Sequence, residues 1–162
     1  MINSTPEWIT RSVSRLRTAA PAADKALRAR IDWAGAPIKS DGPVWNNPAS
    51  GTLDARARAY LMVNCAHCHN PQGSASNSGL FLNYAAAADR TATGIYKRPV
   101  AAGRGSGGHE FAIAPGKPEA SIMIHRMGST EPGVAMPEVG RSLVHEEGVA
   151  LIRDWISSLR AD

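Results

Sequence analysis

The sequence is poor in several features, and each shortage argues against a class of protein. It holds only two cysteines in 162 residues, so no second cysteine pair is present to complete a four-ligand zinc site. No segment reaches the roughly 18 to 20 apolar residues that a transmembrane helix needs, and no apolar stretch follows Met1 as in a signal peptide. Aromatic residues make up only 6% of the chain while alanine is abundant, which favours helices over sheets.

The charge of the chain is uneven but not extreme. The formal net charge is +4; residues 1–60 hold nine Lys or Arg against five Asp or Glu, whereas residues 61–162 hold nine of each. Such a distribution lacks the concentrated basic stripe that marks a nucleic-acid footprint. We therefore expect no nucleic-acid partner. Most of these charges fit a solvated surface, and steering toward a charged partner protein stays open as an alternative.

Both cysteines lie in one pentapeptide, Cys65-Ala66-His67-Cys68-His69, whose C-x-x-C-H pattern is typical of covalent haem c attachment. Each cysteine can add across one vinyl group of a haem, and the histidine directly after the second cysteine can bind the iron. Three alternatives stay open: a redox-active C-x-x-C pair, half of a zinc site and a buried thiol pair. A redox pair normally follows a strand in a βαβ pattern, and structural zinc commonly takes four N or S ligands. The sequence shows neither feature, so we favour one covalent haem.

Apolar periodicity predicts an all-α fold with long loops. The expected helices cover residues 1–20, 24–33, 53–64, 118–127 and 146–160. The last of these has the clearest pattern, with apolar residues at i, i+3, i+4 and i+7. Residues 35–52 are rich in Gly and Pro and read as a loop or linker. We therefore expect an N-terminal extension with one or two helices over residues 1–52, followed by a helical domain around one haem over residues 53–162.

Several finer predictions concern the residues around these helices. Asp54 is expected to cap the helix over 53–64, with Arg56 and Arg58 pointing to solvent. Trp45 is expected to anchor the preceding loop on the core. The glycine-rich segment 103–108 has neither a strand before it nor a helix after it, so it predicts a mobile surface loop and no phosphate site.

The haem interpretation needs a second axial ligand besides His69. A lone methionine more often fills a core than binds a metal, and Met123 and Met127 lie within an expected helix. Met136 differs because it lies in a loop between two helices, directly before Pro137, where nearby Pro and Gly let the chain fold over a flat cofactor. The full set of candidates is Met136, Met123, Met127, His109, His125 and His145.

Several short motifs together resemble one family. They are Tyr60-Leu61, the segment Asn64 to Pro71, Gly79-Leu80-x-Leu82, Pro115-Gly116-x-Pro118-x-x-Ser121, Met136-Pro137 and Trp155-Ile156. Over residues 54–160 the chain resembles bacterial class I type cytochrome c domains, especially those within larger exported proteins of planctomycetes and proteobacteria. The resemblance implies that Cys65 and Cys68 form the thioether bonds, that His69 is the proximal iron ligand and that Met136 is the distal one. The segment 74–114 is longer than in compact members, and Arg104, Arg126 and Arg141 are candidates to hold the propionates.

The resulting expectation is an electron-transfer protein with a His/Met-ligated haem iron, and not an enzyme in its own right. Its partner would be a donor or acceptor redox protein, including a fused or associated dehydrogenase for which it relays electrons. An open iron site, as in a peroxidase or a gas sensor, is the alternative. Because bacteria attach haem c on the periplasmic side of the membrane, we expect a periplasmic or exported protein, from which the signal peptide is missing here.

Overall fold

The computed structural model describes residues 42–161, which belong to a compact unit covering residues 41–162. The helices expected over 1–20 and 24–33 lie outside the described residues. Within 42–161 the secondary structure is helical without any strand, and two isolated bridges join Ile95 to Ile113 and Phe111 to Ser121. The prediction of an all-α fold is thus confirmed for this part of the chain, while the domain boundary at residue 52 stays a prediction.

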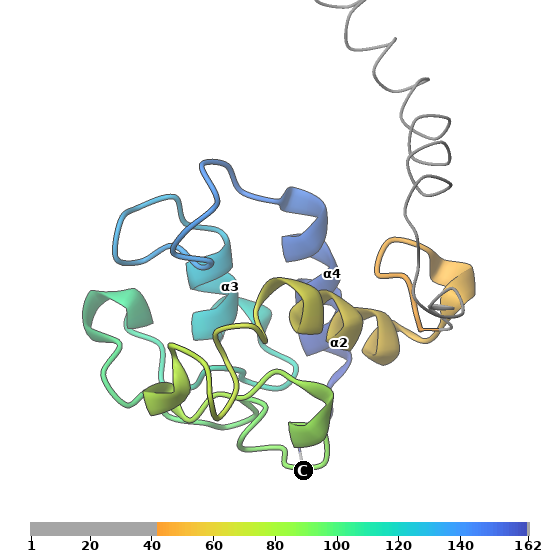
Figure 1. The fold of residues 1–162 in the computed structure, drawn as a ribbon, viewed down its shortest axis with the longest axis horizontal. Helices are drawn as coiled ribbons and strands as arrows, with labels where there is room; N and C mark the ends of the chain where they lie inside the picture. Colours follow the sequence, from red (N-terminus) through yellow and green to blue (C-terminus); the bar gives the residue numbers. More distant parts are fainter. Residues whose placement is uncertain (1–41, 162) are drawn as a thin grey trace, which may run out of the picture. The chain divides into compact units, whose positions relative to one another are not determined.

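The described residues form α-helices joined by long loops with short 3-10 turns (Figure 1). The α-helices are α2 (Leu53–Asn64), α3 (Ile122–Met127) and α4 (Glu146–Ser158). The 3-10 helices are η1 (Pro48–Ser50), η2 (Ser76–Ser78), η3 (Tyr84–Ala86), η4 (Gly103–Ser106) and η5 (Pro118–Ala120). None of the helices in residues 42–161 is both long and apolar enough to cross a membrane.

Helix α4 is the centre of the core. It packs against α2, α3 and η5, and its apolar stripe is almost fully enclosed, with Ile152 and Ile156 at 0% exposure and Trp155 at 1%. This stripe follows the spacing of a helix that buries one face. The opposite face carries polar residues, and Glu146 and Glu147 lie in the first turn, where the helix dipole favours negative charge.

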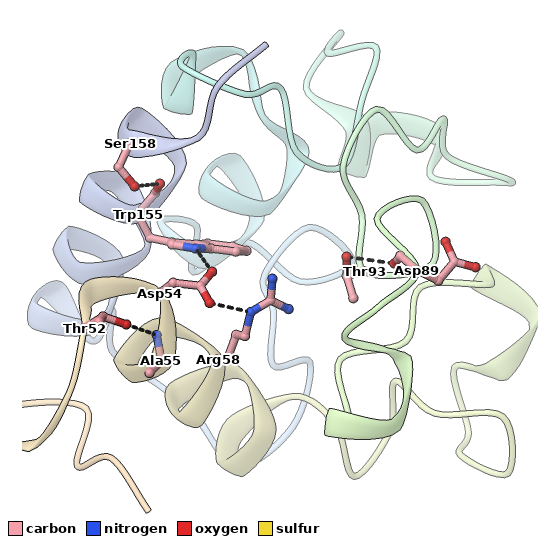
Figure 2. A network of polar contacts seen from close by, with 8 residues as sticks. All are labelled: Thr52, Asp54, Ala55, Arg58, Asp89, Thr93, Trp155 and Ser158. Atoms are coloured by element: carbon pink, nitrogen blue, oxygen red, sulfur yellow. Dashed lines mark hydrogen bonds and ion pairs between the residues drawn. The ribbon is translucent and has the colours of Figure 1, made fainter. Parts of the chain in front are cut away.

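The start of α2 corrects one prediction. Its N-cap is Thr52, whose Oγ1 accepts a hydrogen bond from the Ala55 amide at 3.2 Å. Asp54 lies in the first turn instead, where its Oδ1 accepts a hydrogen bond from Trp155 Nε1 at 2.8 Å and its Oδ2 accepts one from Arg58 Nε at 2.9 Å (Figure 2). The Asp54 carboxylate thus binds Trp155 on α4 and Arg58, and it does not cap the helix.

The arginines of α2 also differ from expectation. Arg58 lies with its guanidinium 5.8 Å from the Trp155 ring centre, and only 24% of its side chain is exposed. Arg56 donates from Nε to the Trp45 carbonyl at 3.0 Å. Both are half-buried, so the prediction that they point to solvent is wrong. The same contacts hold the segment before α2, and the prediction that Trp45 anchors it is confirmed by an edge-to-face contact with Tyr60 at 5.5 Å.

The helix expected over 118–127 is divided in two at Ser121. This residue is extended (φ −104°, ψ 126°) and fully buried. Its hydroxyl donates to the Lys117 carbonyl at 3.0 Å and accepts from the Ala114 amide at 2.9 Å. A buried hydroxyl needs such partners, and satisfying them here interrupts the helix.

The glycine-rich segment is an ordered part of the fold. Helix η4 packs against α3, and a Cβ at Gly107 would lie 2.7 Å from the His125 ring, with Gly107 at φ +58°. Only glycine tolerates both the close approach and this backbone conformation. The expected mobile surface loop is therefore a packed turn on the last residues of α3.

Candidate functional site

The C-x-x-C-H pentapeptide follows α2 directly and forms a tight turn. Cys65 is the C-cap of α2 and donates its amide to the Leu61 carbonyl at 2.9 Å, while the His69 amide donates to the Cys65 carbonyl at 2.9 Å. Ala66 is buried with 4% exposure, whereas His67 is exposed. Helix α2 and its packing on α4 therefore fix the position of the motif.

The residues after the motif close this turn. Asn70 Nδ2 donates to the Ala66 carbonyl at 2.7 Å. Gly73 passes so near that a Cβ there would lie 2.1 Å from the Cys68 carbonyl oxygen. The segment Asn70-Pro71-Gln72-Gly73 therefore folds back against the backbone of the motif.

His69, the last residue of the motif, is half-buried. Its Nδ1 lies 3.4 Å from Ser78 Oγ, and its carbonyl accepts from the Leu82 amide at 2.9 Å. Burial lowers the pKa of His69, the charges of Arg126 and His67 lower it further, and a hydrogen bond to the Leu80 backbone opposes them. The lowered pKa favours the neutral imidazole, which is the form that binds metals.

A cavity of about 190 Å³ opens beside the motif. Cys65 lies on one wall and Met136 on another. Cys68 and His69 are not among the residues that line it. The full lining is Tyr60, Asn64, Cys65, Met127, Met136, Pro137, Gly140, Arg141, His145 and Val149.

The polar wall of the cavity is a hydrogen-bonded pair that no sequence motif indicated. Tyr60 Oη lies 2.9 Å from His145 Nδ1, and the two rings are stacked with an interplanar angle of 12°. Gly148 leaves the space for this pair, since a Cβ there would lie 2.2 Å from Tyr60 Oη. Burial and the Cys65 sulfur raise the pKa of Tyr60, while Arg141 lowers it. Tyr60 therefore stays a neutral hydrogen-bonding group at the cavity wall.

Cys65 is a half-buried thiol and not a reactive thiolate. Burial, with a smaller contribution from Cys68, raises its pKa to about 11. Redox-active C-x-x-C motifs show the opposite shift, because the thiolate is their nucleophile. Within residues 42–161 no group of three or more His, Cys, Asp or Glu is arranged to hold a metal ion. The thiol-redox and zinc alternatives thus gain no support in the described part of the chain.

The loop that carries Met136 is held by arginines bound to backbone carbonyls. Arg126 Nε donates to the Val134 carbonyl at 2.9 Å, Arg141 Nη1 donates to that of Met127 at 2.6 Å and Arg104 Nη2 to that of Pro132 at 2.7 Å. The Met136 amide in turn donates to the Arg126 carbonyl at 3.0 Å. The Met136–Pro137 peptide bond is cis.

The three candidate propionate partners therefore share a role that the sequence did not predict. Only Arg141 lines the cavity, and its Nη2 donates to the Ser129 carbonyl as well. Arg104 is also paired with Glu131. Every residue has a backbone carbonyl, so the sequence does not indicate which carbonyl an arginine binds.

The other candidate axial ligands divide by their surroundings. Met123 and Met127 are buried in the core at 8% and 7% exposure, which agrees with their interpretation as core residues, although Met127 also reaches the cavity. His109 and His125 contact each other with ring centres 5.7 Å apart and do not line the cavity. His145 lines it but is bonded to Tyr60. Met136 lines the cavity from the loop between α3 and α4, and unlike His145 its side chain has no hydrogen-bonded partner among the described residues.

The chain matches no known protein family, no curated protein and no solved structure. The cavity and its residues are therefore the basis for assigning a function.

Proposed function

We propose that this chain is a mono-haem c-type cytochrome with a cytochrome c-like fold, which passes single electrons to or from a redox partner. The observation that carries the proposal is the shared cavity of Cys65 and Met136. One residue comes from the C-x-x-C-H motif at the end of α2, and the other comes from the loop between α3 and α4. A covalent haem c site requires such a meeting of attachment motif and distal loop.

The chemistry of the cavity suits a flat, largely apolar group with an acidic edge. Met127, Met136, Pro137 and Val149 supply apolar walls. The half-buried, neutral thiol of Cys65 lies at the C-terminal end of α2. Tyr60, Arg141 and His145 form the polar part of the lining, where the guanidinium of Arg141 adds one positive charge that suits carboxylates while its donors bind backbone carbonyls. Among the three arginines considered for the propionates, Arg141 is thus the one that the cavity favours.

Each residue then has a defined task. Cys65 and Cys68 would attach the haem covalently, and His69 and Met136 would bind its iron. Ser78 Oγ, 3.4 Å from His69 Nδ1, can orient His69, while Arg126 positions Met136 through the carbonyl that accepts the Met136 amide. When bound, the haem supplies a one-electron couple whose potential is raised by His/Met ligation and whose iron has no open position.

Nothing in this assignment requires acid–base catalysis, so we propose a carrier and not an enzyme. Haem c attachment further implies maturation in the periplasm or during export. Its partner would be a redox protein, including a dehydrogenase to which the domain is fused or bound.

The test is the visible spectrum of the full chain produced in a bacterial periplasm together with haem c maturation proteins. We expect covalent haem and a low-spin ferrous spectrum that carbon monoxide leaves unchanged. Carbon monoxide binding to the unmodified protein would favour the open-site alternative, a peroxidase or gas sensor. Absence of covalent haem would contradict the proposal and return the two cysteines to the thiol alternatives.

A further inference from the structure

The rim of the cavity is acidic, although the described residues as a whole are not. Residues 128–147 contain four acidic residues and one basic residue. The acidic ones are Glu131, Glu138, Glu146 and Glu147, and the basic one is Arg141. Because Arg141 spends its guanidinium donors on the Met127 and Ser129 carbonyls, it is held within the loop while the carboxylates face outward.

Three of these carboxylates have no Lys or Arg at ion-pair distance in residues 42–161. Glu131 is paired with Arg104. Glu147 lies 3.7 Å from His145 Nε2 and keeps 77% of its side chain exposed. Glu138 and Glu146 are exposed as well. Glu138 follows Pro137 of the cavity lining and Glu146 follows His145, so Glu138, Glu146 and Glu147 lie beside the cavity and form what we call the acidic rim.

Exposed aliphatic side chains occur in the same segments. Leu143 is 77% exposed, Val139 is 75% exposed and Val63 is 74% exposed. Val139 precedes the lining residue Gly140, Val63 precedes Asn64, and Leu143 lies between Arg141 and His145. Single exposed aliphatic residues are common on surfaces, but these three border the lining of one cavity. An apolar centre with charged surroundings is the usual composition of a protein contact surface.

We propose that the acidic rim, with Val139 and Leu143, is the docking surface for a basic redox partner protein. This inference rests on the proposed function, since it names the kind of partner that reaches the cavity. The two propionates of a bound haem would add negative charge at the same place. Complementary charge steers the encounter of two proteins and fixes their orientation, and the apolar residues then exclude water from the contact.

The test is titration calorimetry of the full chain against two purified probes, a lysine-rich mitochondrial cytochrome c and an acidic flavodoxin. Titrations at about 10 mM and about 150 mM salt compare screening lengths of about 30 Å and 8 Å. One variant combines Glu138→Gln, Glu146→Gln and Glu147→Gln. Its control combines Glu110→Gln, Glu119→Gln and Asp154→Asn, which changes the net charge equally at exposed positions outside the cavity lining.

We expect the basic probe to bind most tightly at low salt. At about 150 mM salt, where the screening length is about 8 Å, the rim variant should reduce its affinity at least about tenfold and the control less than about threefold, because charges farther from the contact than a screening length contribute little. Leu143→Ser should weaken binding at both salt concentrations, while Val100→Ser, at a residue 70% exposed elsewhere, should not. Equal losses of affinity for the basic probe in the rim variant and in its control would overturn the inference. If the acidic flavodoxin bound the unmodified chain and the rim variant lost that binding, the inference would be overturned as well, because the rim would then favour an acidic partner. The haem spectrum of the same samples separately tests the proposed function, because a haem-loaded chain that ignores the basic probe overturns only the docking surface.

Discussion

The two sides of α4 are held together in different ways. On one side, α2 packs on α4 through apolar side chains, with Trp155 at 1% exposure and its indole bonded to Asp54. On the other, residues 128–145 form part of the lining of a cavity of about 190 Å³ and are fixed by arginines bound to backbone carbonyls. The first arrangement fills its interior, whereas the second leaves space. We infer that the α2–α4 side carries stability and the loop side carries function.

The largest expected effect lies on the α2–α4 side. Trp155→Ala should lower the free energy of unfolding by about 3 to 5 kcal/mol, the usual cost of removing a large buried aromatic side chain. Trp155→Phe keeps much of the packing but loses the donor to Asp54, so its cost should be clearly smaller. Chemical denaturation of the haem-free full chain measures both. A loss below about 1 kcal/mol for Trp155→Ala would contradict the assignment of stability to this side.

An intermediate effect is expected on the loop side from Arg141→Met. This change keeps an apolar stem and removes the hydrogen bonds to the Met127 and Ser129 carbonyls. Hydrogen bonds that involve a charged group contribute about 1.5 to 3 kcal/mol each. Because Arg141 is half-buried and water can reach the two carbonyls in the variant, we expect a total loss at the lower end, about 2 to 3 kcal/mol, in denaturation. Arg153→Met is a control, since its ion pair with Glu119 is exposed and such pairs contribute about 0 to 1 kcal/mol.

Tyr60 belongs to both sides, because it lies on α2 and lines the cavity. The pH dependence of the free energy of unfolding tests its contribution. The pKa of Tyr60 is raised in the folded state, so the neutral phenol stabilises the folded protein relative to the ionised one. This stabilisation is complete below the unfolded pKa of about 10. It is lost as the pH rises through the folded pKa. Tyr60→Phe should cost about 0.5 to 1.5 kcal/mol at pH 7 for the lost hydrogen bond and should remove this alkaline loss. Denaturation at pH 7 and at pH 10.5 checks both, and an alkaline loss as large in the variant as in the unmodified protein would assign it to another group.

The sequence predicted the α2–α4 side better than the loop side. Apolar spacing placed α2 at its observed limits and α4 at its observed start, because one buried face dictates that spacing. It misplaced the cap of α2, since the partner of Asp54 is Trp155 on a distant helix. It also missed the interruption at Ser121, which depends on buried hydroxyl partners. Local pattern carries no information on such tertiary contacts.

For the candidate site, residue type alone brought Cys65 and Met136 forward, and the structure places both on one cavity. The arginine contacts to the loop and the Tyr60–His145 pair could not be foreseen. The arginines bind carbonyls that every residue has, and the pair joins two segments far apart in the sequence. The ligand roles of His69 and Met136 stay predictions.

The smallest effect on stability should come from the residue with the largest expected effect on function. Met136 is half-buried beside existing empty space, so Met136→Ala should cost less than about 2 kcal/mol, below the usual range for a fully packed methionine. If Met136 is the distal ligand, the haem should stay attached through Cys65 and Cys68, while the ferrous protein gains carbon monoxide binding.

Met62→Ala is the control, because Met62 is 37% exposed and does not line the cavity. A Met136→Ala spectrum identical to that of the unmodified protein and insensitive to carbon monoxide would exclude Met136 as ligand. Loss of several kcal/mol with no change in the spectrum would go further, because the loop would then share the structural role of the α2–α4 side. In either case the search for the distal ligand would turn to His145, the other candidate on a loop that lines the cavity.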